Sequence, residues 1–229
     1  MPPKKPAGRG TAGTASPTID FVEPRPERLS AGDPEGLLAG DYREGELFEG
    51  ADLSEYDLAG CSFLECRFDS VTLTDAELRG SRFIESVFVS TFAQSLKAAR
   101  TTWRDVRFDS PRWGSAELFD SELESVHLHG GKIDYLNLRG SRLTNVIVEN
   151  CTIGDLDLGG FTGDRVAFVN CRIQTLDVTR ARCLNVDLRS SEFDAIHGIA
   201  GLAGATIDDA QLSLLAPLLA DHVGLRVEP

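Results

Sequence analysis

The fold is decided by a stretch that divides into blocks of five residues without an insertion or deletion. Beginning at residue 51, the blocks read Ala51-Asp-Leu-Ser-Glu, Tyr56-Asp-Leu-Ala-Gly, Cys61-Ser-Phe-Leu-Glu, Cys66-Arg-Phe-Asp-Ser, Val71-Thr-Leu-Thr-Asp and Ala76-Glu-Leu-Arg-Gly. The same frame holds over residues 46–200, which is 155 residues or 31 blocks. A repeat with a fixed period indicates an architecture in which each repeat is one structural unit.

The third residue of each block, called the centre from here on, is mostly Leu or Phe, and the residue two before it is small or aliphatic. These two positions face the same side of an extended chain, because side chains on a strand alternate between its faces. A period of five cannot keep an apolar stripe on one side of a helix. The pattern therefore predicts short strands and corners that wind around an apolar axis as a solenoid, with backbone hydrogen bonds passing from coil to coil.

This pattern resembles the pentapeptide-repeat family, whose members fold as a right-handed quadrilateral β-helix. The resemblance covers about two-thirds of the chain, residues 46–200. It implies four blocks, or twenty residues, per coil. The expected fold is therefore an all-β solenoid whose 31 blocks make seven to eight coils.

Stacked coils would make residues twenty apart neighbours, and close packing requires such neighbours to compensate in size. Ala93 is too small for a centre, and Trp113, twenty residues later, is too large. Gly163 leaves its centre empty, and Phe161, at the normally small position of the same block, is large enough to fill it. We expect both pairs to compensate each other in the core.

The chain outside the repeats divides into three segments. Residues 1–17 are rich in Pro, Gly and small polar residues and predict a disordered tail. Residues 18–45 are expected to cap the strand edges of the first coil and could also lie along the outside of the rod. Residues 201–229 predict a last strand and a helix, with Thr206 and Asp209 as the N-terminal cap; Pro217 is expected either to kink this helix or to begin a second one.

Two apolar surfaces are candidates for interaction. The repeat places a belt of apolar side chains on the outside of one coil, namely Ile84, Val87, Val89 and Phe92. This belt is too dense for open solvent, so either the N-terminal segment or a partner protein should cover it. The C-terminal helix carries a second stripe, Leu212, Leu215, Leu219 and Val223. That stripe either covers the last coil or pairs with a second copy in a homodimer.

Composition restricts the function. The net charge of −13 and a pI of about 4.7 argue against direct binding to nucleic acid. No segment approaches the eighteen or more apolar residues of a membrane span, so the expected location is the cytoplasm. The five cysteines occupy inward positions without a Cys-x-x-Cys motif and are expected to be buried free thiols, although a Cys151–Cys171 bridge is geometrically conceivable.

No motif in the sequence indicates catalysis. We find no Gly-rich phosphate loop, nucleophile elbow or metalloprotease motif. His127 and His129, with Asp109 and Glu149 one coil away on either side, could hold a metal ion, but a solvated surface pair is the favoured interpretation. We therefore expect a protein that is not an enzyme and that uses no cofactor or metal.

The remaining question is what the surface binds. One expectation is a protein–protein interaction scaffold with an unidentified partner. The alternative comes from the resemblance, because the quinolone-resistance members of the family in bacteria imitate DNA and bind DNA gyrase. An acidic ladder at equivalent outward positions supports this alternative: Asp57, Glu77, Glu117, Asp157 and Asp177. However, residues 46–200 contain 25 acidic and 16 basic side chains, a net charge of −9, whereas B-DNA of the same length, ~36 Å, carries roughly 21 charges.

Overall fold

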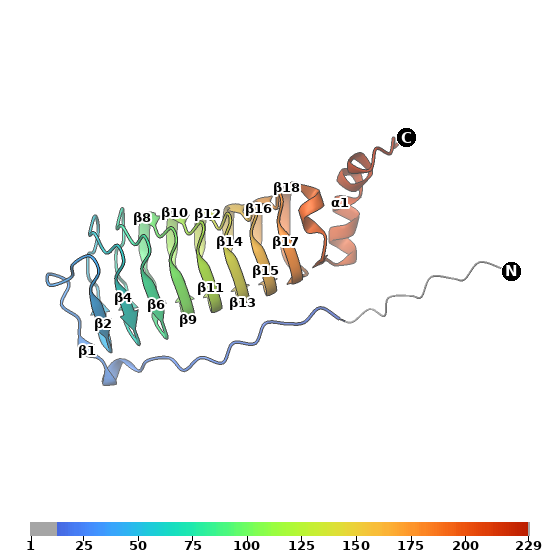
Figure 1. Cartoon of the computed structure of the whole chain (residues 1–229). Helices are drawn as coiled ribbons and strands as arrows, with labels where there is room; N and C mark the ends of the chain where they lie inside the picture. Colours follow the sequence, from blue (N-terminus) through green and yellow to red (C-terminus); the bar gives the residue numbers. More distant parts are fainter. Residues whose placement is uncertain (1–12, 229) are drawn as a thin grey trace.

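The computed structural model describes residues 13–228 as a rod-shaped β-solenoid with one helix at its C-terminal end (Figure 1). Its strands form two parallel sheets. The second sheet stacks β8 (Phe92–Lys97), β10 (Arg112–Glu117), β12 (Lys132–Asn137), β14 (Thr152–Asp157), β16 (Arg172–Asp177) and β18 (Glu192–His197). In the described part of the chain, no helix is long and apolar enough to cross a membrane.

The first sheet runs along the whole solenoid. Its main stack is β1 (Ser30–Ala31), β3 (Glu46–Glu49), β5 (Arg67–Asp69), β7 (Val87–Val89), β9 (Thr102–Asp109), β11 (Glu122–His129), β13 (Arg142–Glu149), β15 (Thr162–Val169), β17 (Arg182–Asp187) and β19 (Ala205–Thr206). Beside its first strands lie β2 (Tyr42–Glu44), β4 (Ser62–Leu64) and β6 (Arg82–Ile84). Within the repeats, paired residues are twenty apart, as in Ala93, Trp113 and Ile133. This register confirms four blocks per coil.

The 31 blocks of residues 46–200 make the predicted seven to eight coils, and the solenoid has about nine turns in the described residues because the winding continues beyond this stretch. The extra coils lie at the two ends. Ser30 pairs with Glu46, sixteen residues later, and Ala205 pairs with Val186, nineteen residues earlier. Because neither end coil advances by twenty residues, the five-residue frame in the sequence does not reveal them. Residues 30–45 are therefore a shortened first coil as well as a cap.

The corners explain the five-residue frame. The residue two after each centre forms a corner, and from Gly40 to Ser190 its φ is positive, between 48° and 80°. The five exceptions are spaced twenty residues apart, from Ser95 to Thr175. This left-handed conformation disfavours β-branched residues and favours Gly, Asn and Asp. The exceptions lie within the second sheet, where the strand continues across the corner. The chain thus has two kinds of corner, a left-handed turn and an extended crossing.

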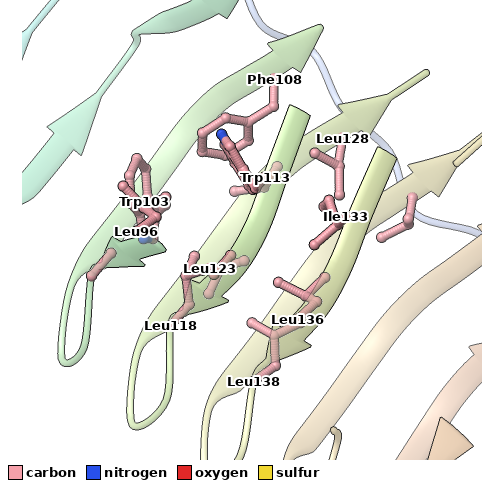
Figure 2. Packing of buried hydrophobic residues seen from close by; sticks show 14 of the residues in the cluster. Leu96, Trp103, Phe108, Trp113, Leu118, Leu123, Leu128, Ile133, Leu136 and Leu138 are labelled. Carbon is pink, nitrogen blue, oxygen red and sulfur yellow. The ribbon is translucent and has the colours of Figure 1, made fainter. Parts of the chain in front are cut away.

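The core is a column of side chains that stack from coil to coil. Near the N-terminal end, Phe63, Phe83 and Trp103 stack face to face with centroid separations of 5.1 and 4.3 Å. A parallel stack contains Phe48, Phe68, Phe88 and Phe108, and the two stacks meet mainly edge to face. Between Trp113 and Phe161, leucine, valine and isoleucine take the place of the aromatic rings, and the first of these coils are shown in Figure 2. The burial of this apolar surface contributes about 25 cal/mol per Å² to the free energy of unfolding and is the main stabilising term of the rod.

Both predicted compensations are present in the core. Trp113 pairs directly with Ala93, and both side chains are buried. At Gly163, a Cβ atom would lie 2.7 Å from Cε2 of Phe161, so the phenyl ring fills the space that a centre side chain normally takes. The core therefore keeps a constant volume although individual blocks depart from the repeat.

The inward position two before the centre does not use its N–H in the strand ladder. At Cys66, Thr101, Ser121 and Cys171 this N–H donates to the hydroxyl of the serine twenty residues later, at 3.0–3.2 Å. Pro111 occupies the same position, and losing its N–H costs the ladder nothing. Arg112 N still donates to Thr91 O at 2.9 Å, so the coils continue through the proline without interruption.

The C-terminal helix α1 (Asp209–His222) closes the last coil. Its N-cap is Asp208, which forms a capping box with Gln211, so the predicted cap at Thr206 was wrong by two residues. The buried amide of Gln211 donates to Leu188 O at 2.6 Å and to Ser191 O at 2.7 Å. Pro217 lies inside the helix, which runs on to His222.

Candidate interaction surface

The four belt residues do not form one accessible surface. They follow the chain round a coil, with Ile84 at the end of β6, Val87 and Val89 at the ends of β7, and Phe92 at the start of β8. Val87 is not part of the core cluster, and yet its exposed fraction is only 1%. Ile84 and Val89 are half-buried. The belt as predicted therefore has to be corrected, because Val87 is covered and cannot meet a partner in this conformation.

The cover over Val87 is the N-terminal segment. Residues 13–24, called the strap from here on, run along the solenoid from β1 toward its C-terminal end (Figure 1). Glu23 lies 2.8 Å from Nη1 of Arg107 and 3.8 Å from Nη1 of Arg67. Arg67 and Arg107 are the two register neighbours of Val87, so the strap passes directly over it. Of the two expected covers, the N-terminal segment is present.

The sequence contained a signal for the strap. Pro17, Ile19, Phe21 and Glu23 alternate with exposed residues, which is the pattern of an extended segment with one buried side. The prediction missed the strap because it placed a boundary between residues 17 and 18, with a tail before it and a cap after it. This boundary separated the alternating pattern from its continuation at Thr14 and Ala15. Residues 1–12 of the predicted tail lie outside the described residues.

Phe92 is the belt residue that remains open. Its side chain is 50% exposed at the start of the second sheet. It lines a shallow groove of about 710 Å³ on the outside of that sheet, together with Arg112, Trp113, Gly114 and Lys132. Gly114 is required there because a Cβ atom would lie 2.5 Å from the carbonyl oxygen of Gln94. The groove thus combines an exposed aromatic ring with two cationic side chains and one carboxylate, that of Asp134.

The acidic ladder lies in one outward column, but its charges are paired. Glu77 is the register neighbour of Asp57, and Asp177 that of Asp157. One Nη of Arg139 lies 2.7 Å from Asp157 and 3.5 Å from Asp177. Lys97 stands between Glu77 and Glu117 in the same column. The column is therefore interrupted by the cation Lys97 and the neutral Asn137, and Arg139 pairs with two of its carboxylates from beside it.

Several ladder carboxylates also have a structural role. Oδ1 of Asp57, Asp157 and Asp177 accepts a hydrogen bond from the backbone N–H two residues later, at 3.1, 2.8 and 2.7 Å. Asn137, in the same column, makes the same bond at 3.1 Å. These hydrogen bonds stabilise the turn that follows. For Asp177, burial raises the pKa, but the Thr179 hydrogen bonds and the Arg139 charge outweigh it, so its pKa lies below the usual range.

The two histidines each bind a carboxylate on the outside of β11. His127 Nε2 lies 3.1 Å from Glu149, and His129 Nδ1 lies 3.3 Å from Asp109. Burial lowers the pKa of His127 below its ordinary value, and the Glu149 carboxylate opposes this shift only in part. Within residues 13–228, no group of three His, Cys, Asp or Glu side chains converges on a metal position.

The predicted stripe on α1 is only partly buried against the last coil. Leu215 is buried and Leu219 packs partly against the core, on the same side as Gln211. Leu212 and Val223 are exposed, so the last coil covers only part of the predicted stripe. The two hydrogen bonds of Gln211 fix the rotation of the helix, and positions four and eight residues later then face the coil. Leu214 and Leu218 are also exposed, on the side of the helix away from Leu212.

Comparison with known proteins identifies the repeat. The sequence model described as pentapeptide repeats matches residues 47–83 in eight copies. No curated protein matches the chain at a significant level.

Solved structures resemble the chain only distantly. QnrB1, a plasmid-mediated fluoroquinolone resistance protein, is 15% identical and has a TM-score of 0.31, over 78% of this chain and 99% of its own. HetL, a pentapeptide repeat protein involved in heterocyst differentiation regulation from the cyanobacterium Nostoc sp. strain PCC 7120, is 14% identical with a TM-score of 0.32, over 76% and 93%. The matched repeats, together with the five-residue frame that the backbone follows from Gly40 to Ser190, identify this chain as a member of the pentapeptide-repeat family.

Proposed function

We propose that this chain is a non-catalytic scaffold for protein–protein interaction, and that the groove around Phe92 is a surface at which it meets a partner. The observation that carries the proposal is the half-exposed phenyl ring of Phe92, which is followed in the same outward column by Arg112 and then Lys132. Aromatic and arginine side chains are enriched among the residues that dominate binding energy at interfaces. A partner surface that offers an apolar side chain beside a carboxylate would complement this groove.

The packed core supports a role without catalysis. The internal void among the core residues Phe108, Trp113, Leu123 and their neighbours measures about 30 Å³, which is far below the several hundred Å³ of a typical ligand pocket. The groove at Phe92 is larger but shallow and open to the surface. Binding at the outer walls is therefore the role that the geometry supports best.

The test is affinity capture from an extract of the cell that produces the protein, comparing the wild type with Phe92→Asp. The matched control is Leu184→Asp, which changes an equally exposed apolar residue on the other sheet. We expect Phe92→Asp to abolish capture of a specific partner and Leu184→Asp to retain it. Capture that both variants retain, or that the wild type never achieves, would contradict the proposal.

The alternative, an acidic DNA mimic that binds DNA gyrase, is less well supported by the surface. Lys97 interrupts the acidic ladder, Arg139 pairs with two of its carboxylates, and three of its carboxylates hold turns in place. A mimic needs an unbroken negative surface, because DNA carries one charge per ~1.7 Å of axis. A gyrase supercoiling assay discriminates the two functions, and we expect no inhibition at micromolar concentrations of this protein.

A further inference from the structure

The strap contacts the solenoid through side chains rather than through strand pairing. Among the described residues, the backbone of the strap makes one hydrogen bond to the solenoid, from Ala15 N to Asn185 Oδ1 at 3.1 Å. Thr14 adds a contact between its hydroxyl and that of Thr206. The backbone N–H and C=O groups of the solenoid already form hydrogen bonds between coils. A ligand of this wall must therefore be recognised by the side chains of the solenoid.

The length of the strap requires an extended conformation. Glu23 lies at the level of Val87, and Ala15 lies at Asn185, about five coils further along. Five coils at ~4.8 Å measure about 24 Å, and eight extended residues at ~3.3 Å span about 26 Å. An eight-residue helix would cover only about 12 Å. The wall therefore accepts an extended chain that runs across the strands, parallel to the axis of the rod.

The wall beneath the strap has a defined chemistry. Its outward column, called the docking column from here on, comprises Arg67, Val87, Arg107, His127, Ile147 and Ala167. Two arginines at one end face Glu23 of the strap. The apolar residues Ile147 and Ala167 follow, and Asp187 continues the same column at the level of Asn185. The column thus favours a peptide with apolar side chains at alternate positions and a carboxylate at one end.

The strap does not fill this wall completely. A recess of about 480 Å³ remains between Pro17, Ile19 and Phe21 on the strap and Arg107, His127 and Ile147 on the solenoid. Nε of Arg107 is buried and has no hydrogen-bond partner. A buried unsatisfied donor costs about 1–3 kcal/mol, so a ligand that supplied an acceptor there would bind better than the strap does.

We propose that the docking column is a binding groove for an extended segment of a partner protein, with apolar residues at alternate positions and a carboxylate that reaches Arg67 and Arg107. The strap is the intramolecular occupant that this segment displaces. The inference deepens the proposed function, on which it rests, by assigning a second wall and the chemistry of its ligand. A tethered strap competes at an effective concentration in the millimolar range, so the groove is closed to weak ligands and open to tight ones.

The test uses the full-length protein and a fluorescein-labelled peptide with the sequence of residues 13–28 as the probe. A strap-loosened variant carries Ile19→Ser, Phe21→Ser and Glu23→Gln, which leave the solenoid unchanged. Fluorescence anisotropy should show saturable binding to this variant and binding at least about tenfold weaker to the wild type. Equal affinity for the two proteins, or no saturable binding to either, would overturn the proposal.

Two controls assign the site. In the strap-loosened background, Arg107→Glu should abolish probe binding, whereas Arg104→Glu, on the neighbouring wall beside Glu124, should leave it unchanged. Binding that survives Arg107→Glu would refute the docking column as the site. Light scattering tests whether the strap of a second copy of the chain occupies the docking column. A wild-type dimer that dissociates in the strap-loosened variant would show exchange of straps between two copies and would contradict a separate partner segment.

The outcome is separable from that of the proposed function. The scaffold role is decided by capture at Phe92, which lies on the second sheet, away from the docking column. Failure of the probe to bind, together with capture that depends on Phe92, would remove the docking column and leave the scaffold. The reverse result would remove Phe92 as the interaction surface and leave the docking column.

Discussion

At the scale of single residues, the corner residues determine the five-residue repeat. Each left-handed corner needs a residue that tolerates positive φ, and a non-glycine residue there is strained by about 1–2 kcal/mol. Glu65 is such a residue, with φ of 51°, whereas Ser95 occupies the same position of its block in an extended conformation. The position in the frame alone does not determine the corner type.

Replacing these two residues by glycine should therefore have opposite effects. Glu65→Gly relieves strain and should stabilise the protein or leave it unchanged, whereas Ser95→Gly adds flexibility to a strand and should cost about 0.5–1 kcal/mol. Urea unfolding followed by circular dichroism measures both. A larger loss of stability in Glu65→Gly than in Ser95→Gly would contradict the assignment of the two corners.

The exchange of sizes between Phe161 and Gly163 gives a second prediction. Phe161→Ser alone should leave a cavity and cost about 3–5 kcal/mol, and Gly163→Leu alone should overpack the core at a cost of about 1–3 kcal/mol. The double variant reproduces the Ser141 and Leu143 pair of the preceding coil and should recover most of the loss. Unfolding midpoints of all four proteins form a double-mutant cycle. Additive losses would show that the two positions do not compensate.

His127 reports on the strap through its pKa. Burial lowers this pKa, and both the strap residues Pro17, Ile19 and Phe21 and the solenoid groups Glu149, Arg107 and His129 surround the ring. Because the pKa is lower in the covered state, protonation favours the uncovered state. The strap should therefore hold firmly above the ordinary value of about 6.5 and loosen as the pH falls through and below it.

NMR titration of the His127 ring protons tests this expectation. The strap-loosened variant with Ile19→Ser, Phe21→Ser and Glu23→Gln should show a higher His127 pKa than the wild type. The same pKa in both proteins would mean that the strap does not contribute to the burial of the ring.

At the scale of elements, α1 covers the last coil because the side chain of Gln211 makes the hydrogen bonds that a further coil would otherwise make. Gln211 donates to Leu188 O, just as the Ser191 hydroxyl donates to Phe168 O one coil earlier, twenty-three residues apart in both cases. Gln211→Leu should leave the Ser191 carbonyl without a partner and Leu188 O with only its bond from Ser191 N, cost about 1–3 kcal/mol and speed hydrogen exchange in β17 and β18. Leu212→Ser, on the exposed side, is the control. Unchanged exchange in Gln211→Leu would contradict the capping role.

The sequence predicted the periodic part of the molecule well, because stacking imposes the same constraint on every coil. Register, the Ala93–Trp113 pair and the filling of Gly163 by Phe161 all follow from that constraint. Non-periodic parts were not predictable in this way. The first coil advances by sixteen residues, and the rotation of α1 depends on the amide of Gln211. The strap lies on the wall through Glu23 and Ala15, which are far from their partners in the sequence.

At the scale of the whole molecule, α1 leaves apolar surface uncovered. Leu214 and Leu218 are 68% and 44% exposed and lie four residues apart on one side of the helix. We expect a second copy to cover them in a homodimer, since exposed apolar patches mark interaction sites. Light scattering should give twice the chain mass for the wild type and the monomer mass for Leu214→Glu with Leu218→Glu. A monomeric wild type at high micromolar concentration would exclude the dimer.

The central claim is that the strap spans the solenoid and covers the docking column. A disulfide trap measures this directly: Ala15→Cys with Asn185→Cys, in a Cys183→Ser background that removes the neighbouring half-buried thiol. The control pairs Ala15→Cys with Asn145→Cys, two coils away from Asn185 in the same column. We predict that mass spectrometry after mild oxidation finds an intramolecular link from 15 to 185 and little from 15 to 145. Equal yields of the two links, or no link at all, would contradict the strap.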